Sequence, residues 1–242
     1  MNLKKTTNLT ILCFLFIFPS ISFAEVNEID SNFDGKIDQW QHMGGDGKVT
    51  KIEHDGDFDG KVDQIEHFTG DKKLVRVEFD KNKDGNMDHF QHYNNSGKMV
   101  RVEKSSKQNG KIDWKEYYTG DKKLQRVQID DNGDGKFETV QIYDSNEQLI
   151  EIRGDANADG RVDRWSKYKN DKLNYTAFDT TGNGKPDQWQ QYDSAQNLKK
   201  AEYDTNGDGK VDRWEHFNGG NKPTKIELDR NFDGKVDMTK KK

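Results

Sequence analysis

The feature that most constrains this chain is an internal repeat. A motif of the form D-x-[DN]-x-[DN]-G begins at Asp30, and its successive copies follow at intervals of 25, 25, 25, 25, 25, 24, 25 and 25 residues. The later copies begin at Asp55, Asp80, Ser105, Asp130, Asp155, Asp179, Asp204 and Asp229. Chains built from one short unit fold by stacking the copies, each of which contacts mainly its neighbours. The repeat therefore predicts one continuous array, with no separate catalytic domain.

The composition argues against a single large core. Of the 242 residues, 30% are hydrophobic and 34% are charged. Polarity of this degree is typical of disorder. The aromatic residues, however, are 11% of the chain and recur at fixed positions of the repeat. We therefore expect a thin or elongated fold with many small, local cores.

Each unit is predicted to form a β-hairpin followed by an acidic loop. Counting from the first Asp of the motif, positions 8 to 14 and 20 to 25 are rich in β-branched and aromatic residues, and positions 15 to 19 hold Asn, Gly, Asp and Lys. Short β-rich runs bounded by such turn residues indicate hairpins. The predicted fold class is all-β, with tandem hairpins stacked as a solenoid or an extended twisted sheet. A closed β-propeller with two repeats per blade is the alternative.

Two apolar positions alternate along the first strand of each unit. Position 11 is usually aromatic, as in Trp40 and Trp189, and position 14 is usually Tyr or Phe, as in Tyr93. Side chains three residues apart in a strand point to opposite faces. We expect positions 8 and 14 on one face, and position 11 on the other as a ladder of rings that packs the repeats together.

The first 24 residues resemble a secretory signal peptide. Lys4 and Lys5 precede an apolar run at residues 11–18, and Ser22 and Ala24 supply small residues before a cleavage site. We expect cleavage after Ala24. Residues 25–242 would then form one array of about eight and a half repeats, exported to the periplasm, the cell surface or the medium, with no membrane span. Cys13 is the only cysteine, so the exported chain needs a staple other than a disulfide, and a metal ion is the usual one.

The repeated loops carry the chemistry of a calcium site. Positions 1, 3, 5 and 9 hold Asp, Asn or Glu, and position 6 is Gly. Calcium binds six to eight hard oxygen ligands, and a glycine permits the sharp turn that gathers them. Carboxylates gathered without a cation would repel one another and open the loop. The pattern contains no His or Cys, which argues against zinc.

Seven loops keep the full pattern. Their expected calcium ligands are Asp30, Asn32, Asp34, Asp38, Asp55, Asp57, Asp59, Asp63, Asp80, Asn82, Asp84, Asp88, Asp130, Asn132, Asp134, Glu138, Asp155, Asn157, Asp159, Asp163, Asp204, Asn206, Asp208, Asp212, Asp229, Asn231, Asp233 and Asp237. A weaker site is expected at Asp179, Thr181, Asn183 and Asp187. The loop at Ser105 is expected to bind no ion, with the Lys107 ammonium in its place.

The loop resembles those of known calcium-binding families. Positions 1, 3, 5 and 6 are similar to EF-hand and dockerin loops. An Asp at position 9 without an obligatory Glu at position 12 looks more like the DxDxDGxxD loops of integrin-type FG-GAP repeats, because position 12 varies from Gln41 to Ser166. The segment at 192–198 also faintly resembles bacterial YD-type β-repeats. The calcium resemblance implies a structural ion with an affinity of about 0.1–1 mM.

These patterns predict a calcium-rigidified scaffold that is not an enzyme. Its partner would be a protein or a glycan, and no basic stripe points to nucleic acid. A carbohydrate-binding module using exposed Trp and Tyr is the alternative, and a hydrolase is a more distant one, because the carboxylates all sit in repeated positions. Four histidines share position 13, where we expect an exposed site that tolerates polar residues, the alternatives being a transition-metal site or a pH sensor. They are His42, His67, His92 and His216.

Overall fold

The computed structural model describes residues 25–70 and 72–241. The predicted signal peptide, residues 1–24, lies outside this range and stays a prediction. The described residues form strands and connecting loops, without a helix. Among the same residues, no helix is long and apolar enough to cross a membrane.

Eighteen strands form one sheet. They are β1 (Val26–Ile29), β2 (Gln39–Met43), β3 (Val49–His54), β4 (Gln64–Phe68), β5 (Leu74–Phe79), β6 (His89–Tyr93), β7 (Met99–Lys104), β8 (Trp114–Tyr118), β9 (Leu124–Ile129), β10 (Thr139–Tyr143), β11 (Leu149–Gly154), β12 (Arg164–Lys169), β13 (Lys172–Phe178), β14 (Gln188–Tyr192), β15 (Leu198–Tyr203), β16 (Arg213–His216), β17 (Lys225–Leu228) and β18 (Met238–Lys241).

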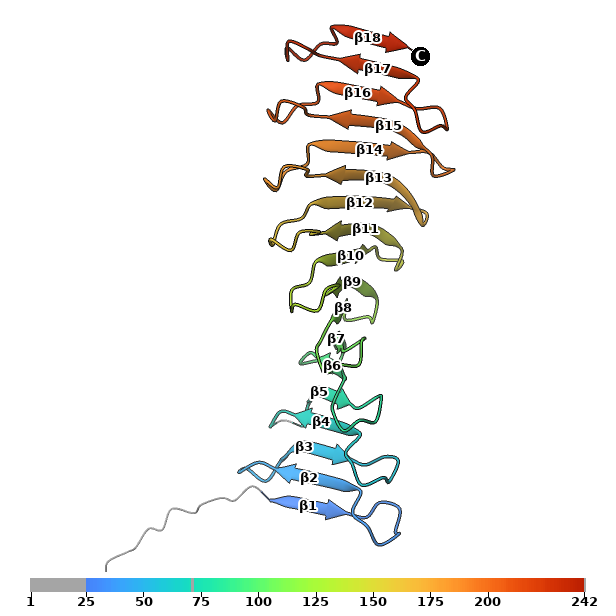
Figure 1. Cartoon of the computed structure of the whole chain (residues 1–242). Helices are drawn as coiled ribbons and strands as arrows, with labels where there is room; N and C mark the ends of the chain where they lie inside the picture. The colour runs from blue at the N-terminus through green and yellow to red at the C-terminus, as the bar shows by residue number, and fades with distance from the viewer. Residues whose placement is uncertain (1–24, 71, 242) are drawn as a thin grey trace, which may run out of the picture.

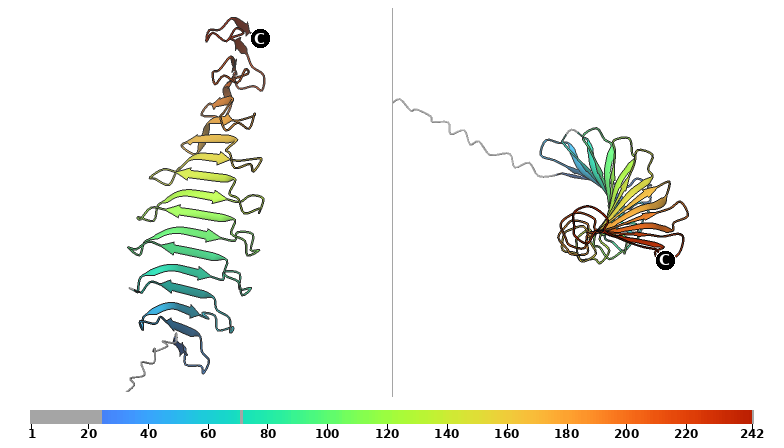
Figure 2. Two further views of the ribbon diagram at one scale, coloured as in Figure 1. Left: turned by 90° about the vertical axis from the view of Figure 1, so that its left-hand side faces the viewer. Right: turned by 90° about the horizontal axis from the view of Figure 1, so that it is seen from above.

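The sheet is open, antiparallel and one layer thick. Each strand pairs with the strands directly before and after it in the chain, from β1 with β2 to β17 with β18. The strands stack along one axis and fan around it, as the side view and the view from above show (Figures 1 and 2). Such rotation between neighbours is the usual twist of β-strands. The predicted extended twisted sheet is confirmed. The propeller alternative is wrong, because consecutive hairpins pair with each other without the breaks that would separate blades.

The first strand of each hairpin begins later than the sequence suggested. In the first repeat the strand starts at position 10, Gln39, whereas position 8, Ile37, lies in the loop. The loop closes through the amide of Asp38, which donates to the carbonyl oxygen of Ile29 at 3.1 Å. Position 9 therefore serves the loop, and the prediction that position 8 shares a strand face with position 14 is wrong.

One face of the sheet holds most of the apolar core. We call it the valine face, because Val77, Val102 and Val127 occupy position 23 there with at most 4% of their surfaces exposed. Gln and Glu side chains stand opposite these valines, as Gln91 does for Val77. Tyr93, at position 14, donates a hydrogen bond to Gln91 at 2.7 Å, and the same bond recurs in other repeats. The expected small, local cores are therefore present, but they are rows shared by neighbouring hairpins.

The opposite face is predominantly ionic, and we call it the histidine face. Its two rows hold positions 11 and 24 and positions 13 and 22. Trp40 at position 11 stands between Glu28 of β1 and Glu53 of β3. Acidic side chains thus alternate with aromatic ones, or with Ile65, in the N-terminal half of this row. The predicted ladder of stacked rings is wrong, because a residue of the intervening strand separates one ring from the next, as Glu53 follows Trp40 and Ala177 lies between Trp165 and Trp189.

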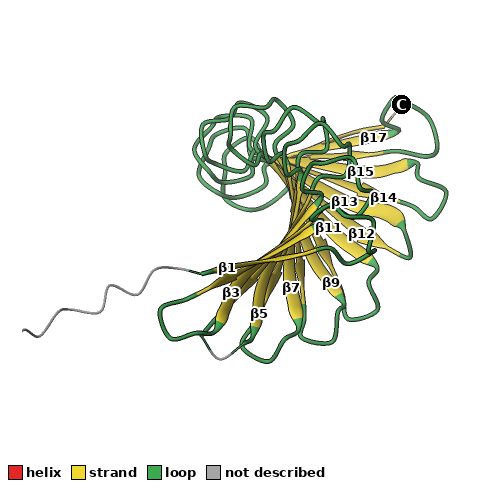
Figure 3. Cartoon of the chain, turned by 90° about the horizontal axis from the view of Figure 1, so that it is seen from below, coloured by secondary structure: helices red, strands yellow, loops and turns green. Residues whose placement is uncertain are grey.

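The connectivity sorts the loops by type to the two edges of the sheet. Acidic loops join odd-numbered to even-numbered strands, and short turns join even-numbered to odd-numbered ones. In an antiparallel sheet every connection of one kind leaves from the same edge. Nine acidic loops therefore follow one edge and eight turns follow the other, both winding with the twist of the strands (Figure 3).

Candidate metal sites

The acidic loops are curled by their own carboxylates. In the first loop, Asp30 accepts hydrogen bonds from the amides of Asp34 at 3.1 Å and Gly35 at 2.8 Å. Asp38, at position 9, accepts from the amide of Ser31 at 3.1 Å. The bond from the position 6 amide to the position 1 carboxylate recurs in all eight loops that begin with Asp. These bonds turn the oxygens of positions 1 and 9 toward the loop interior.

Two positions of each loop adopt left-handed backbone conformations. Position 6 does so at Gly35, with φ of 92°, which explains the glycine of the motif. Position 4 does so as well, and it is Gly133 in one loop but Phe33 and Phe58 in others, with φ of 82°, 64° and 63°. A non-glycine residue in this region costs on the order of 1 kcal/mol or more. The requirement at position 4 was missed in the sequence because only some repeats meet it with glycine.

Three acidic groups converge in each of two loops. The ligand atoms of Asp55, Asp57 and Asp63 all lie within 4.8 Å of one another, and those of Asp130, Asp134 and Glu138 do the same. These are positions 1, 3 and 9 in one loop and positions 1, 5 and 9 in the other. The donor sets consist of carboxylate oxygens on a curled backbone, which fits calcium. The metal chemistry predicted for these six residues therefore has a geometric basis.

Hydrogen bonding keeps the central carboxylate of the second cluster ionised. Burial raises the pKa of Asp130, but hydrogen bonds from the amides of Gly135 and Gly133 lower it by more. The net pKa therefore lies below the ordinary value for aspartate. Gly135 donates at 2.8 Å and Gly133 at 2.6 Å. An aspartate that is ionised at neutral pH is in the state that a cation requires.

The other full-pattern loops share the curl without the tight clustering of three acids. Asp80, Asp155, Asp204 and Asp229 accept from the position 6 amide at 2.7 to 2.8 Å, as Asp30 does. Their position 9 carboxylates accept from the amides at positions 2 and 3 in the loops at Asp80, Asp155, Asp204 and Asp229. The predicted ligands at positions 1 and 9 are therefore brought into the loop in each case. The number of ions bound, about seven, stays a prediction.

The two degenerate loops differ from the rest. In the loop at Asp179, the Thr181 hydroxyl donates to Asp179 at 3.1 Å, which occupies one of its acceptor sites. In the loop at Ser105, the Lys107 ammonium donates to the carbonyl oxygens of Asp130 at 3.3 Å and Asp131 at 3.0 Å. The prediction that Lys107 replaces the ion of its own loop is wrong. Its ammonium reaches the next loop, because its own loop has neutral Ser105 and Asn109 at positions 1 and 5.

Neighbouring loops are linked along the edge by cationic side chains. Lys83 donates to Asp57 of the preceding loop. Lys136 donates to the carbonyl oxygen of Ala158 in the following loop at 2.7 Å, and Arg161 makes the corresponding contact with Gly182 at 2.9 Å. The hydrogen bond from Lys83 is also the largest influence lowering the pKa of Asp57. Lys83 therefore competes for one carboxylate of the first three-acid cluster.

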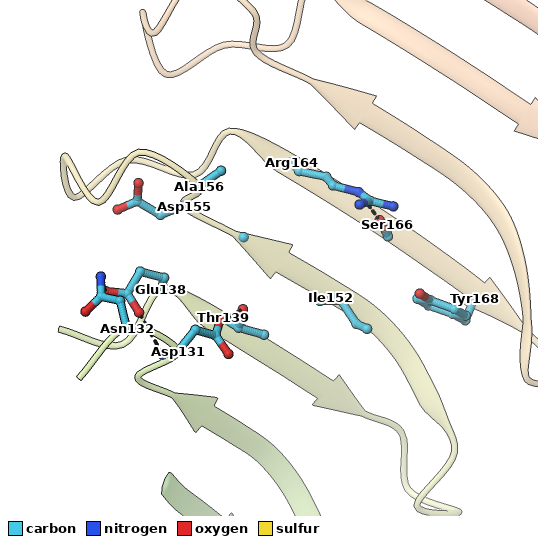
Figure 4. Close-up of a pocket in the computed structure, with 11 residues that line it drawn as sticks. Asp131, Asn132, Glu138, Thr139, Ile152, Asp155, Ala156, Arg164, Ser166 and Tyr168 are labelled. Carbon is cyan, nitrogen blue, oxygen red and sulfur yellow. Dashed lines mark hydrogen bonds between the residues drawn. The ribbon is translucent and has the colours of Figure 1, made fainter. Parts of the chain in front are cut away.

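A depression of about 410 Å³ adjoins the loop at 130–138 (Figure 4). It exists because Gly154 stands where other repeats place a large side chain, such as Ile129 or Phe178. Ser166 likewise replaces the usual Gln or Glu of position 12, and its hydroxyl accepts from Arg164 at 3.1 Å. At the rim, Thr139 donates to Asp131 at 2.6 Å. This break in the valine face was missed, although the small residues at 154 and 166 mark it in the sequence.

The position 13 histidines are hydrogen-bonded rather than free. Each Nε2 lies within hydrogen-bonding distance of a glutamate of the following strand: His42 of Glu53 at 2.6 Å, His67 of Glu78 at 2.6 Å, His92 of Glu103 at 2.8 Å and His216 of Glu227 at 2.7 Å. They are partly buried, so the expectation of exposed sites is wrong. Lys51 pairs across the sheet with both His42 and His67 and separates them. This separation argues against a shared transition metal.

Comparison with known proteins points to the loop. A family model described as an EF hand matches residues 201–215, which cover the end of β15, the loop at Asp204 and the start of β16. The match therefore lies on a strand–loop–strand segment, not on a helix–loop–helix unit. It supports the EF-hand resemblance at one loop, whereas the FG-GAP and YD-type resemblances stay predictions. No curated protein matches the chain.

Solved structures give only distant likenesses. The chain is similar to a GtfA/B complex bound to UDP and GlcNAc, with a TM-score of 0.26 and 15% identity over 59% of this chain and 26% of that one. It is also similar to a TcdB2-TccC3-Cdc42 complex, with a TM-score of 0.21 and 10% identity over 84% and 12%. A Photorhabdus luminescens Tc holotoxin pore gives 0.22 and 11% over 82% and 12%. TM-scores this low carry no argument about fold or function.

Proposed function

We propose that this protein is an exported, non-enzymatic scaffold whose long sheet is stiffened by calcium bound along one edge. The observation that carries the proposal is the convergence of Asp55, Asp57 and Asp63, and of Asp130, Asp134 and Glu138, within loops that repeat along the chain. The EF-hand match at residues 201–215 supports the same ion.

The proposed role of calcium follows from electrostatics. Without a cation, three carboxylates within 4.8 Å repel one another and favour an open loop. A divalent ion reverses the sign of that interaction and ties the end of one strand to the start of the next. Because the ion binds the curled loop and not the extended chain, its binding energy adds to the folding energy.

A scaffold role also fits the shape of the sheet. A single layer leaves both faces accessible along its whole length, and the repeats present similar side chains at regular intervals (Figure 1). The partner displayed or bound by those faces is expected to be a protein or a glycan. The carboxylates of the loops belong to repeated positions, which favours a structural ion over a catalytic one.

Calcium titration of the purified, chelated protein tests the proposal. We expect the β-sheet circular dichroism signal and the Tm to rise between about 0.1 and 10 mM calcium, and to rise much less with magnesium, which tolerates such irregular oxygen sites poorly. Equal stability in chelator and in calcium would show that the loops are turns held by their own hydrogen bonds, and would exclude the calcium-stiffened scaffold.

A further inference from the structure

We propose that the histidine face carries a binding pocket for an acidic sugar residue, a uronate, centred on Tyr117. A shallow depression of about 680 Å³ lies there, lined by Arg101, Tyr117, Tyr118, Gln125 and Arg126 among others. The inference goes beyond the scaffold role, because it gives the chemistry of a partner. It does not depend on the acidic loops, which lie at the edge of the sheet.

Strand register places two arginines on either side of one aromatic residue, although the Arg101 guanidinium also contacts His92, with Nη2 3.3 Å from its ring nitrogens. Tyr117 of β8 stands directly opposite Arg101 of β7 and Arg126 of β9. The guanidinium carbon of Arg126 lies 4.1 Å from the centroid of the Tyr117 ring. Directly opposite side chains on neighbouring strands are close enough to act on one ligand group.

The histidine face loses one negative charge at β9. In every other repeat that has a cation at position 22, a glutamate follows two residues later: Lys51 lies 2.7 Å from Glu53 and Lys200 lies 2.6 Å from Glu202. In β9 the corresponding residue is Gln128. Arg126 therefore lacks the carboxylate that its counterparts have, and the amide in its place carries no charge.

A further cation strengthens the imbalance. Position 11, elsewhere usually aromatic, is Lys115 in β8, and its ammonium lies 3.8 Å from Glu103. Glu103 also pairs with His92 at 2.8 Å and with Arg101 at 3.6 Å, so this single carboxylate is shared. In the two rows next to Tyr117, the three cations Arg101, Arg126 and Lys115 thus share one carboxylate, and the Lys115 ammonium also lies 4.2 Å from the Phe137 ring centroid.

The equivalent position in an earlier repeat shows the usual balance. His67 has Lys51 and Arg76 as its direct cross-strand neighbours. Glu53 and Glu78 lie in the adjoining row, so two cations face two carboxylates there. The site around Tyr117 therefore has an excess of two positive charges relative to the repeat, which favours an anionic ligand.

The lining selects among anions. Planar guanidinium groups bind carboxylates through paired hydrogen bonds. The ring of Tyr117 offers apolar surface for the C–H face of a sugar on the side that Arg126 does not cover, and the Gln125 amide can bond its hydroxyls. β7, β8 and β9 are interior strands with neighbours on both sides, so their backbones offer no edge on which a peptide could add as a strand. A uronate meets these conditions better than an acidic peptide.

The test measures binding of glucuronate and of a glucuronate-containing disaccharide by NMR titration and calorimetry, at fixed saturating calcium. Gln128→Glu restores the acid that other repeats carry and removes no cation. We expect it to weaken uronate binding at least tenfold without lowering the Tm, and Arg126→Gln to have a similar effect on binding.

Two matched variants control for charge and for position. Gln141→Glu adds the same charge on the valine face of the next strand, at a position where other repeats carry Glu. Arg76→Gln removes a cation of the same row whose carboxylate partner is present. Both should keep the affinity within about twofold.

Several results would overturn the proposal: no detectable binding of glucuronate, equal binding of the neutral glucose analogue, or unchanged affinity in Gln128→Glu. Equal competition by a polyglutamate peptide would exclude a sugar-specific pocket. Binding that is lost in the loop variant Asp63→Asn but kept in Gln128→Glu would place the sugar on bound calcium instead. The calcium response of the Tm is measured separately, so failure of the pocket leaves the scaffold proposal to be judged by itself.

Discussion

Replacing Asp63 by asparagine should lower the stability of the protein in calcium but not in chelator. Asp63 is at position 9 of the loop at Asp55 and belongs to the first three-acid cluster. Its Oδ2 accepts hydrogen bonds from the amides of Gly56 at 2.7 Å and Asp57 at 3.1 Å. An asparagine oxygen can accept the same bonds, so the curl of the loop is retained while one negative charge is lost.

The negative charge of Asp63 destabilises the loop in chelator and stabilises it in calcium. In chelator, loss of the charge relieves repulsion from Asp55 and Asp57, so Asp63→Asn should be at least as stable as the parent protein. In calcium, the parent gains RT ln(1 + [Ca]/Kd) at this loop. For a Kd of about 0.1–1 mM and 10 mM calcium, this gain is about 1.4–2.7 kcal/mol. For a chain of this size that corresponds to roughly 3–10 °C in Tm.

A matched control is available in the degenerate loop. Asp113 occupies position 9 of the loop at Ser105 and accepts from the amide of Ser106 at 2.6 Å, but positions 1, 3 and 5 of that loop carry no acid. Asp113→Asn should change the Tm by the same amount in chelator and in calcium. Differential scanning calorimetry of the three proteins in both buffers gives the comparison. If Asp63→Asn and Asp113→Asn respond identically to calcium, the loop at Asp55 is not a calcium site.

Three further predictions follow from individual contacts. Gly154→Ile should stabilise the protein by about 1 kcal/mol in urea unfolding, because a Cβ there meets nothing within 4 Å and glycine weakens a strand interior; a loss of stability would contradict the open depression. Lys83→Met should tighten calcium binding in calorimetry, since its ammonium pairs with Asp57; unchanged affinity would mean that the pair does not compete. Burial raises the pKa of Glu53, but hydrogen bonds from Lys51 and His42 lower it more, so the net pKa lies below 4.5. The stability that Glu53 contributes should therefore be present above about pH 4.5 and be lost as the pH falls through the lower folded pKa, and Glu53→Gln should flatten this part of the Tm profile.

Features that arise within one repeat could be predicted from the sequence. Contacts that depend on how strands and loops of different repeats are placed could not. The hairpins, the glycine of position 6 and the inward carboxylates of positions 1 and 9 follow from local turn and strand chemistry, and the structure has them. The His42–Glu53 pair joins positions 13 and 24, which meet only once the register of the hairpin is known. Lys107 reaches a different loop, so its partner could not be found within its own repeat.

The strand start was misplaced for a related reason. An apolar residue at position 8 is compatible with a strand, but the amide and carboxylate of position 9 are both used to close the loop, so pairing begins at position 10. The breaks at Gly154 and Gln128 are visible in the sequence only as departures from the repeat. Their meaning depends on knowing which face of the sheet each residue occupies.

A one-layer sheet is stabilised mainly by the rows of side chains on its faces and by the loops at its edges. The buried apolar side chains of the described residues are Val77, Val102, Val127, Ala177 and Ala201. Full burial of a valine contributes about 1.5–3 kcal/mol. An occupied calcium loop at about 1.4–2.7 kcal/mol is of the same size, and it acts at the edge of the sheet, where no core forms. In repeats whose position 23 is not fully buried, the loop becomes the larger contribution. The stability of the array should therefore depend on both contributions along its length. The two degenerate loops lie between hairpins with buried position 23 residues: Val102 and Val127 flank the loop at Ser105, and Ala177 and Ala201 flank the loop at Asp179.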